Sequence, residues 1–146
     1  MRVREIGIIV GSIPIICLKF ESEDISTDED LHTMHNISKC AYISSILTFA
    51  ERFGSKVEYF ESGKQHIVFN KNTIENKQKK QMDIYTYLII EKEKNFEKLL
   101  EKKIRPFLEE LLSEFKSQYS YQVYAEVSQF QDFSNIIEQK VKEKLK

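Results

Sequence analysis

Short apolar runs separated by polar stretches predict strands at the start of the chain. Residues Ile6–Val10 and Ile15–Phe20 are rich in isoleucine at successive positions, as in strands that are covered on both faces. Gly11, Ser12 and Pro14 lie between the two runs and favour a tight turn. The first twenty residues are therefore predicted to form a hairpin.

The middle of the chain predicts three further strands. Lys56–Glu61 and Gln65–Asn70 flank Ser62-Gly63-Lys64, which is typical of a hairpin. The lysine-rich stretch Lys71–Gln81 is interpreted as an exposed, mobile loop. Ile84–Ile90 is apolar on both of its faces, so this strand is predicted to lie at the centre of the sheet with a layer on each side.

Helical periodicity marks three other segments. Residues Leu31–Phe53 carry one broad apolar stripe and precede Gly54, a common residue just after a helix. A second long helix is predicted over Asn95–Tyr119, with Asn95 as its N-cap and a kink or break at Pro106. After a connector, Phe133–Leu145 predicts a short amphipathic helix.

These elements assemble into an α/β (α+β) fold. A five-stranded, mostly antiparallel sheet would be sandwiched between one helix on one face and two C-terminal helices on the other. The last strand would pair with the first strand, which leaves the second and third strands at the two edges. No internal repeat or linker divides the chain, so residues 1–146 are predicted to form a single domain.

Composition narrows the function classes. The chain has 146 residues, of which 41% are hydrophobic, and 22 basic against 23 acidic residues give a net charge of -1. Such a balance is unusual for a nucleic-acid binder, so no nucleic-acid partner is expected. Cys17 and Cys40 form no framework or metal pair, which favours free thiols in a cytoplasmic protein. The apolar run at the N-terminus is interrupted by Gly11 and Pro14, which opposes a signal peptide.

Candidate chemical groups form no complete set. His32 and His35 share a helix face, but two further zinc ligands are missing, and the acidic stretch 21–30 lacks the spacing of a calcium loop. Cys40 has no base placed beside it by the sequence, and Gly63-Lys64 lacks the frame of a phosphate-binding loop. We therefore expect no enzyme activity, no cofactor and no metal.

Clustered lysines and tyrosines give weaker evidence for a binding surface. Lys77, Lys79 and Lys80 would suit phosphates or anionic lipid, although interspersed acids favour a simple solvated surface. Weak peripheral membrane contact therefore stays open as an alternative. Three tyrosines at or near the connector, Tyr119, Tyr121 and Tyr124, are expected to pack the connector onto the sheet. They are not expected to stack on bases, because no basic groove accompanies them.

The layout resembles the longin and roadblock group of small profilin-like domains, and is closer to longin. The resemblance rests on a hairpin turn followed by Pro14, a long helix ending in Phe53-Gly54, and a meander ending in the apolar strand 84–90. The segment Phe130–Phe133 is similar to the start of the final helix in prokaryotic relatives, and the helix with Pro106 is long for a roadblock domain. The resemblance covers nearly the whole chain.

The resemblance implies a non-enzymatic interaction module of small-GTPase regulation or vesicle trafficking that acts through homo- or heterodimers. Its partners would be a Ras-like GTPase or a related longin or roadblock domain, in the cytoplasm or at a membrane surface. Two partner surfaces are predicted: the edge strand with Val57, Tyr59 and Glu61, and the first long helix around Tyr42, Ser45 and Phe49. A ligand-sensing domain of the PAS or GAF type is the alternative, and it requires a cavity beside the sheet.

Overall fold

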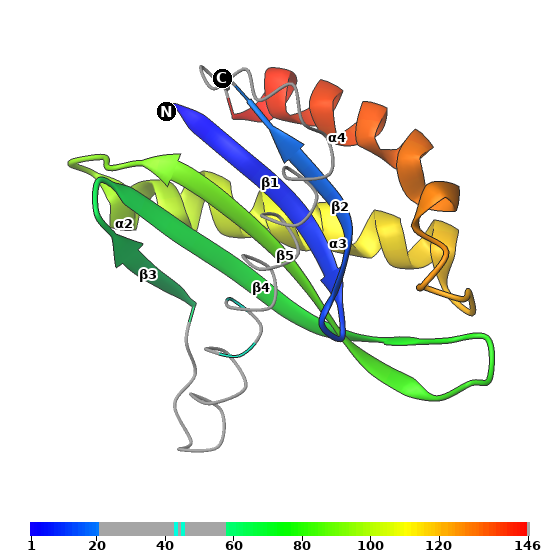
Figure 1. The fold of residues 1–146 in the computed structure, drawn as a ribbon. Helices are drawn as coiled ribbons and strands as arrows, with labels where there is room; N and C mark the ends of the chain where they lie inside the picture. Colours follow the sequence, from blue (N-terminus) through cyan, green and yellow to red (C-terminus); the bar gives the residue numbers. More distant parts are fainter. Residues whose placement is uncertain (21–42, 44, 46–57, 146) are drawn as a thin grey trace, which may run out of the picture.

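The computed structural model describes residues 1–20, 43, 45 and 58–145. Its centre is a five-stranded sheet in the order β2-β1-β5-β4-β3, in which every neighbouring pair of strands is antiparallel. Figure 1 shows the strands crossing in front of the C-terminal helices. The strands are β1 (Val3–Val10), β2 (Ile13–Lys19), β3 (Tyr59–Ser62), β4 (Gln65–Glu75) and β5 (Gln81–Glu91).

The apolar runs lie where their pattern predicts. β5 is the middle strand, and all residues from Ile84 to Ile90 are buried. β1 pairs with it along its length, so β2 and β3 lie at the edges, as predicted. Gly11 and Gly63 adopt φ values of +64° and +60° in the two predicted turns. Glycine has no Cβ and tolerates this conformation at the first central position of a two-residue hairpin turn.

The helix predicted over Asn95–Tyr119 is interrupted, as expected from its proline. α2 (Phe96–Leu99) leads into a π-helical turn, Leu100–Ile104, and α3 (Arg105–Tyr119) follows. Pro106 has no N–H, and its ring would collide with the carbonyl four residues earlier, so the backbone widens before it. Asn95 occupies the N-cap position, but its side chain makes no capping hydrogen bond.

The C-terminal helices cover one face of the sheet. α3 contacts β4 and β5, while α4 (Gln131–Lys144) and the 3-10 helix Val127–Phe130 contact β2. Phe115, Phe130 and Phe133 are fully buried between them, with ring centroids 5.4–5.6 Å apart in the Phe115 pairs. These rings pack with Ile6, Ile8 and Leu88 into one hydrophobic core, which is the larger of the two that the described residues form.

The opposite face carries a second core. Among the described residues, its buried members are Ile9, Ile43, Ile67, Phe69, Tyr85, Tyr87 and Ile89. The predicted helix over 31–53 lies outside the described residues except at Ile43 and Ser45, which both have helical backbone. Ile43 is buried in this second core. The α+β fold with its five-stranded antiparallel sheet is thus confirmed.

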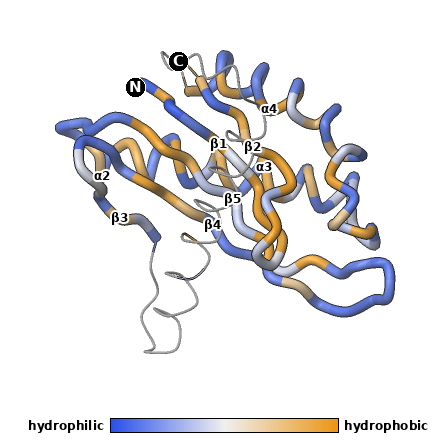
Figure 2. The backbone as a smooth tube through the Cα atoms, in the orientation of Figure 1, coloured by the Kyte–Doolittle hydropathy of each residue, from blue (hydrophilic) through white to orange (hydrophobic). Residues whose placement is uncertain are grey.

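The interpretation of Lys71–Gln81 as a mobile loop is wrong. β4 continues to Glu75, β5 begins at Gln81, and only residues 76–80 form the turn. Every residue from Gln65 to Glu75 pairs with a residue of β5. Figure 2 shows this end as a hydrophilic tube that leaves the hydrophobic centre of the sheet. Its polar composition reflects a paired hairpin whose residues are mostly exposed, and does not indicate a loop.

The three connector tyrosines separate into two groups. Tyr124 is buried and donates hydrogen bonds to the carbonyl oxygens of Tyr119 at 2.8 Å and Glu75 at 3.2 Å. Tyr119 packs against the rings of Phe115 and Phe130, so both tyrosines anchor the connector as predicted. Tyr121 is 56% exposed, which contradicts the prediction for this residue: its backbone N–H, and not its ring, joins the connector to the hairpin through the carbonyl of Glu75. None of the described helices is long and apolar enough to cross a membrane.

Candidate functional site

An open depression of about 510 Å³ lies where β3, the start of β4 and the turn between β5 and α2 meet. Tyr59 and Glu61 contribute from β3, and His66 contributes from β4. The remaining wall is the segment Lys92–Lys98, which includes Phe96 at the start of α2. Two predicted partner-binding residues, Tyr59 and Glu61, are therefore part of one concave site.

The hairpin turn determines which side chains meet there. Gly63 and Lys64 form a two-residue turn, which pairs Ser62 with Gln65 and places Glu61 directly opposite His66. Side chains of directly opposite residues share a face of the sheet. Both side chains point to the helix-covered face, where Phe96 packs edge-on against the Tyr59 ring at 4.8 Å between centroids.

His66 is the most buried polar group of the site. Its side chain stacks on Phe96 with ring centroids 3.8 Å apart and planes 3° from parallel, and the residue is 4% exposed. Nε2 lies 3.0 Å from Oε1 of Glu61, so it donates its hydrogen to the carboxylate. Within the described part of the chain, the buried Nδ1 has no hydrogen-bond partner. An enclosed Nδ1 suits a positioning role better than proton exchange with a substrate.

Glu61 links His66 to solvent. Its second carboxylate oxygen lies 3.3 Å from Nζ of Lys92, and 55% of its side chain is exposed. The hydrogen bond from His66, followed by that from Lys92, lowers the pKa of the Glu61 carboxyl. Glu61 is therefore negatively charged at neutral pH and keeps surface open to a further hydrogen-bond donor.

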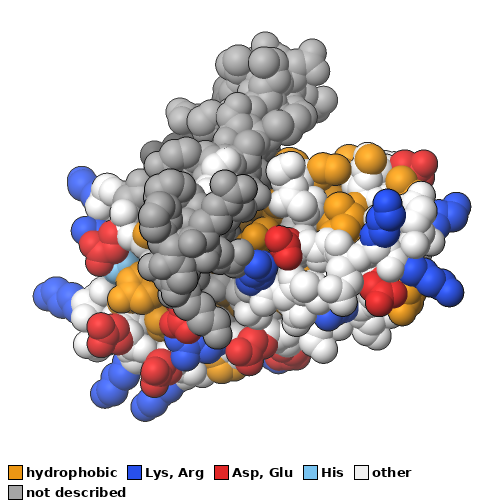
Figure 3. Space-filling view, turned by 90° about the horizontal axis from the view of Figure 1, so that it is seen from below, with side chains coloured by type: hydrophobic (Ala, Val, Ile, Leu, Met, Phe, Trp, Pro, Cys, Tyr) orange, Lys and Arg blue, Asp and Glu red, His pale blue; other side chains and the backbone are white. Residues whose placement is uncertain are grey.

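Charges around the depression nearly cancel. Lys92, Lys94 and Lys98 alternate with Glu93 and Glu97 along its wall. Side chains of both signs are also interspersed over the described part of the face seen in Figure 3. Such an arrangement gives no strong field of one sign, so it favours recognition by shape and hydrogen bonds over attraction of a highly charged ligand.

The other predicted residues lie elsewhere. Val57, Tyr42 and Phe49 fall outside the described residues, and so do His32, His35 and Cys40. Ser45 is exposed. Among the residues that the structure describes, no group of three His, Cys, Asp or Glu side chains is placed to hold a metal ion. Cys17 lies 3.5 Å from the hydroxyl of Tyr87.

The sequence pattern does not indicate a functional role for two residues of the site, His66 and Lys92. The signal for His66 was the length of the turn: once Gly63 and Lys64 are its only central residues, Glu61 must face His66. Lys92 follows β5 immediately, and nothing in the local pattern shows that the end of this strand lies next to the β3–β4 turn.

Comparisons with known proteins give this arrangement no counterpart. No family model matches the chain, and no curated protein or solved structure matches it either. Its function is therefore inferred from the geometry of its own residues.

Proposed function

We propose that this chain is a non-enzymatic protein-interaction module that pairs an extended segment of its partner with β3. The observation that carries this proposal is the position of β3, which has β4 as its only strand neighbour in the described part of the sheet. An edge strand presents unpaired backbone groups to an incoming strand, and many recognition domains bind peptides in this way.

The register identifies the backbone groups that would bind. The N–H of Phe69 donates to the carbonyl of Glu58, and hydrogen-bonded residues alternate along an antiparallel pair. Residues 58, 60 and 62 therefore face β4, while the N–H and C=O groups of Tyr59 and Glu61 point away from it. These two residues supply the main-chain contacts, and the depression beside them accepts a side chain of the added strand.

The depression favours a particular kind of side chain. Tyr59 and Phe96 provide apolar ring surface, and the exposed edge of Glu61 provides a charged acceptor. A side chain with an apolar stem and a cationic or hydrogen-bonding end, such as arginine or lysine, matches both features.

The partner class follows from the resemblance to longin and roadblock domains. The observed hairpin, central apolar strand and C-terminal helices agree with the layout on which that resemblance rests. We accordingly propose a Ras-like small GTPase or a related longin or roadblock domain as the partner, in a regulatory or trafficking-type scaffold that forms homo- or heterodimers in the cytoplasm.

The test is affinity capture from source lysate with GDP and with a non-hydrolysable GTP analogue, read by mass spectrometry. Glu61→Pro removes the outward N–H of β3, whereas the matched control Glu61→Ala keeps this donor and removes the same side chain. We expect a GTPase or a related small domain to be captured by the wild type, in a smaller amount by Glu61→Ala because the carboxylate acceptor is lost, and not by Glu61→Pro. Capture of such a partner by Glu61→Pro as efficiently as by Glu61→Ala would refute docking on β3. Capture of neither class by the wild type would refute the proposed partners.

A second candidate function is small-ligand sensing of the PAS or GAF type. Its supporting observation is the depression itself, whose volume of about 510 Å³ lies in the usual range of small-molecule sites. A polar ligand bound there would stabilise the fold by mass action. A screen of metabolites by thermal shift, with Phe96→Leu as the altered-site variant, tests it; ligands that stabilise both proteins equally would argue against this site.

A further inference from the structure

The β4–β5 hairpin projects beyond the rest of the sheet as a stiff structure. Pairing with β1 ends at Ile84, but β4 and β5 remain paired to Glu75 and Gln81. Figure 1 shows this hairpin extending past the other strands. Its turn is held by Asn76, whose Oδ1 accepts hydrogen bonds from the backbone N–H groups of Gln78 and Lys80, both at 3.0 Å.

The connector between α3 and α4 supports the hairpin from one side. The N–H of Tyr121 donates to the carbonyl of Glu75 at 2.8 Å, and Asn76 forms an isolated parallel β-bridge with Gln122. Lys116 donates to the side chain of Asn72 at 3.2 Å. Ile74 is buried beneath these contacts. The tip is therefore presented as a fixed shape, which lowers the entropy cost of binding through it.

The charge of this tip is strongly positive, although the whole chain carries -1. Lys77, Lys79 and Lys80 are exposed, and none of them forms an ion pair within the described part of the chain. The acids nearby are the half-buried Glu75, Asp83, which lies 3.8 Å from Lys71, and Glu126 of the connector. Three lysines thus face solvent together on one turn.

Apolar side chains are exposed at the same end. Ile13, Tyr121 and Val123 are the exposed large hydrophobic residues of the described chain. Tyr121 and Val123 lie in the connector that pairs with the hairpin, and the β1–β2 turn that precedes Ile13 is joined to β5 by the bond from Gly11 N–H to Asp83 carbonyl. Exposed apolar side chains beside a basic cluster mark an interaction surface.

We propose that this end of the molecule, which we call the hairpin tip (Ile13, residues 76–80 and residues 121–123), binds the surface of membranes that contain anionic lipid. Lysines attract the negative surface and can extend toward lipid phosphates, while Tyr121 and the aliphatic side chains enter the interfacial layer. Nucleic acid fits less well for two reasons. The tip projects instead of forming a groove, and its lysines are not flanked on both sides by aromatic rings on which bases could stack.

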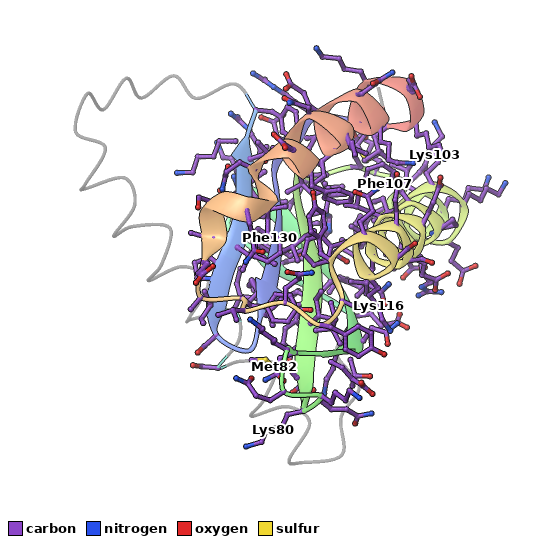
Figure 4. The ribbon with its side chains drawn as sticks, turned by 90° about the vertical axis from the view of Figure 1, so that its right-hand side faces the viewer. Lys80, Met82, Lys103, Phe107, Lys116 and Phe130 are labelled. Atoms are coloured by element: carbon purple, nitrogen blue, oxygen red, sulfur yellow. The ribbon has the colours of Figure 1, made fainter. Side chains whose placement is uncertain are left out.

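This surface is separate from the docking strand of the proposed function. His66 and α2 lie at the opposite end of the β4–β5 ladder from Glu75 and Gln81. Figure 4 shows Lys80 and Lys103 at opposite ends of the molecule. A chain bound to lipid by its hairpin tip would therefore keep β3 available to a protein partner.

The experiment is sedimentation of the full chain with phosphatidylcholine vesicles, with and without about one-third phosphatidylserine. The test variant replaces Lys77, Lys79 and Lys80 by Gln. The control replaces Lys98, Lys102 and Lys103 by Gln, which removes the same net charge from exposed positions in α2 and the π-helical turn. Each lysine near an anionic surface contributes about a fivefold change in partition coefficient, so the test variant should bind on the order of a hundredfold less. The control should bind like the wild type.

A third variant separates lipid insertion from simple charge attraction. Tyr121→Asn retains a residue that tolerates positive φ, and it removes the exposed ring. It should weaken binding to phosphatidylserine vesicles even at high salt, where lysine contributions are screened. Equal losses in the two lysine variants, or no binding of the wild type to anionic vesicles, would overturn the proposal. Tighter binding to a single-stranded oligonucleotide than to the vesicles would do so as well, and none of these results bears on β3.

Discussion

Replacing Gly7 by alanine should destabilise the fold, although alanine ordinarily suits a strand interior better than glycine. Gly7 of β1 lies opposite Tyr87 of β5, and the tyrosine ring crosses directly over it. A Cβ atom at position 7 would lie 2.5 Å from Cε1 and 2.6 Å from both Cζ and Oη of Tyr87. Tyr87 is fully buried, and its hydroxyl donates to Glu5 at 2.6 Å, so the ring has no free space to enter.

The expected change in the free energy of unfolding combines two destabilising effects and one stabilising effect. Overpacking a buried site costs about 1–3 kcal/mol. Displacing the Tyr87 hydroxyl from Glu5 adds about 1–2 kcal/mol, because a buried carboxyl loses a hydrogen bond. Removing glycine from the unfolded ensemble returns about 0.5–1 kcal/mol. The free energy of unfolding should therefore fall by roughly 1–4 kcal/mol, with a decrease in Tm of at least about 2 °C.

Urea unfolding followed by far-ultraviolet circular dichroism measures this change. The matched comparison is Gly7→Ala in a Tyr87→Val background, where the shorter side chain leaves room for the new methyl group. Alanine should be neutral or stabilising there, so the coupling energy between positions 7 and 87 should account for the whole loss. The reasoning is wrong if Gly7→Ala is as stable as the wild type, or if it costs the same in both backgrounds.

Three further predictions concern single contacts. Thr86 is fully buried in β5, and within the described chain its hydroxyl has no hydrogen-bond partner. In urea unfolding, Thr86→Val should therefore raise the free energy of unfolding by about 1 kcal/mol, whereas Thr86→Ser should lower it. Tyr124→Phe loses the bonds to the carbonyls of Glu75 and Tyr119 and should cost about 1 kcal/mol in urea unfolding, whereas Tyr121→Phe at an exposed position should cost nothing measurable. Hydrogen bonds from Lys144 and Lys140 lower the pKa of the Glu110 carboxyl below its ordinary 4.5, so its stabilising contribution is present above that value and is lost as the pH falls through the lowered pKa. The difference in free energy of unfolding between the wild type and Glu110→Gln should accordingly vanish in acid; a difference that stays constant down to that pH would contradict this assignment.

The central sheet was predictable because burial leaves a strong trace in the sequence. Ile84–Ile90 is apolar on both faces, and only a middle strand buries both. The break near Pro106 was predictable for the same kind of reason, because a missing donor and a ring collision act locally.

The hairpin and the depression were harder to predict because distant parts of the chain determine them. Residues 71–75 are polar apart from Ile74, and they form a strand only because residues 81–85 pair with them. His66 becomes a buried, stacked side chain only because α2 brings Phe96 over it. Neither contact can be read from local propensity, so the sequence pattern predicts a loop over residues 71–81 and does not indicate the buried position of His66.

The pairing of β1 with β5 also sets the order of events during synthesis. Ile8 pairs with Thr86, which is 78 positions later in the chain. At a translation rate of about 5–20 residues per second, an apolar strand waits roughly 4–16 s for its permanent neighbour. During that interval the hairpin with β2 provides its first strand pairing, and closing so long a loop makes formation of this sheet slow. Newly made β1 therefore keeps one unpaired strand edge until β5 has been synthesised.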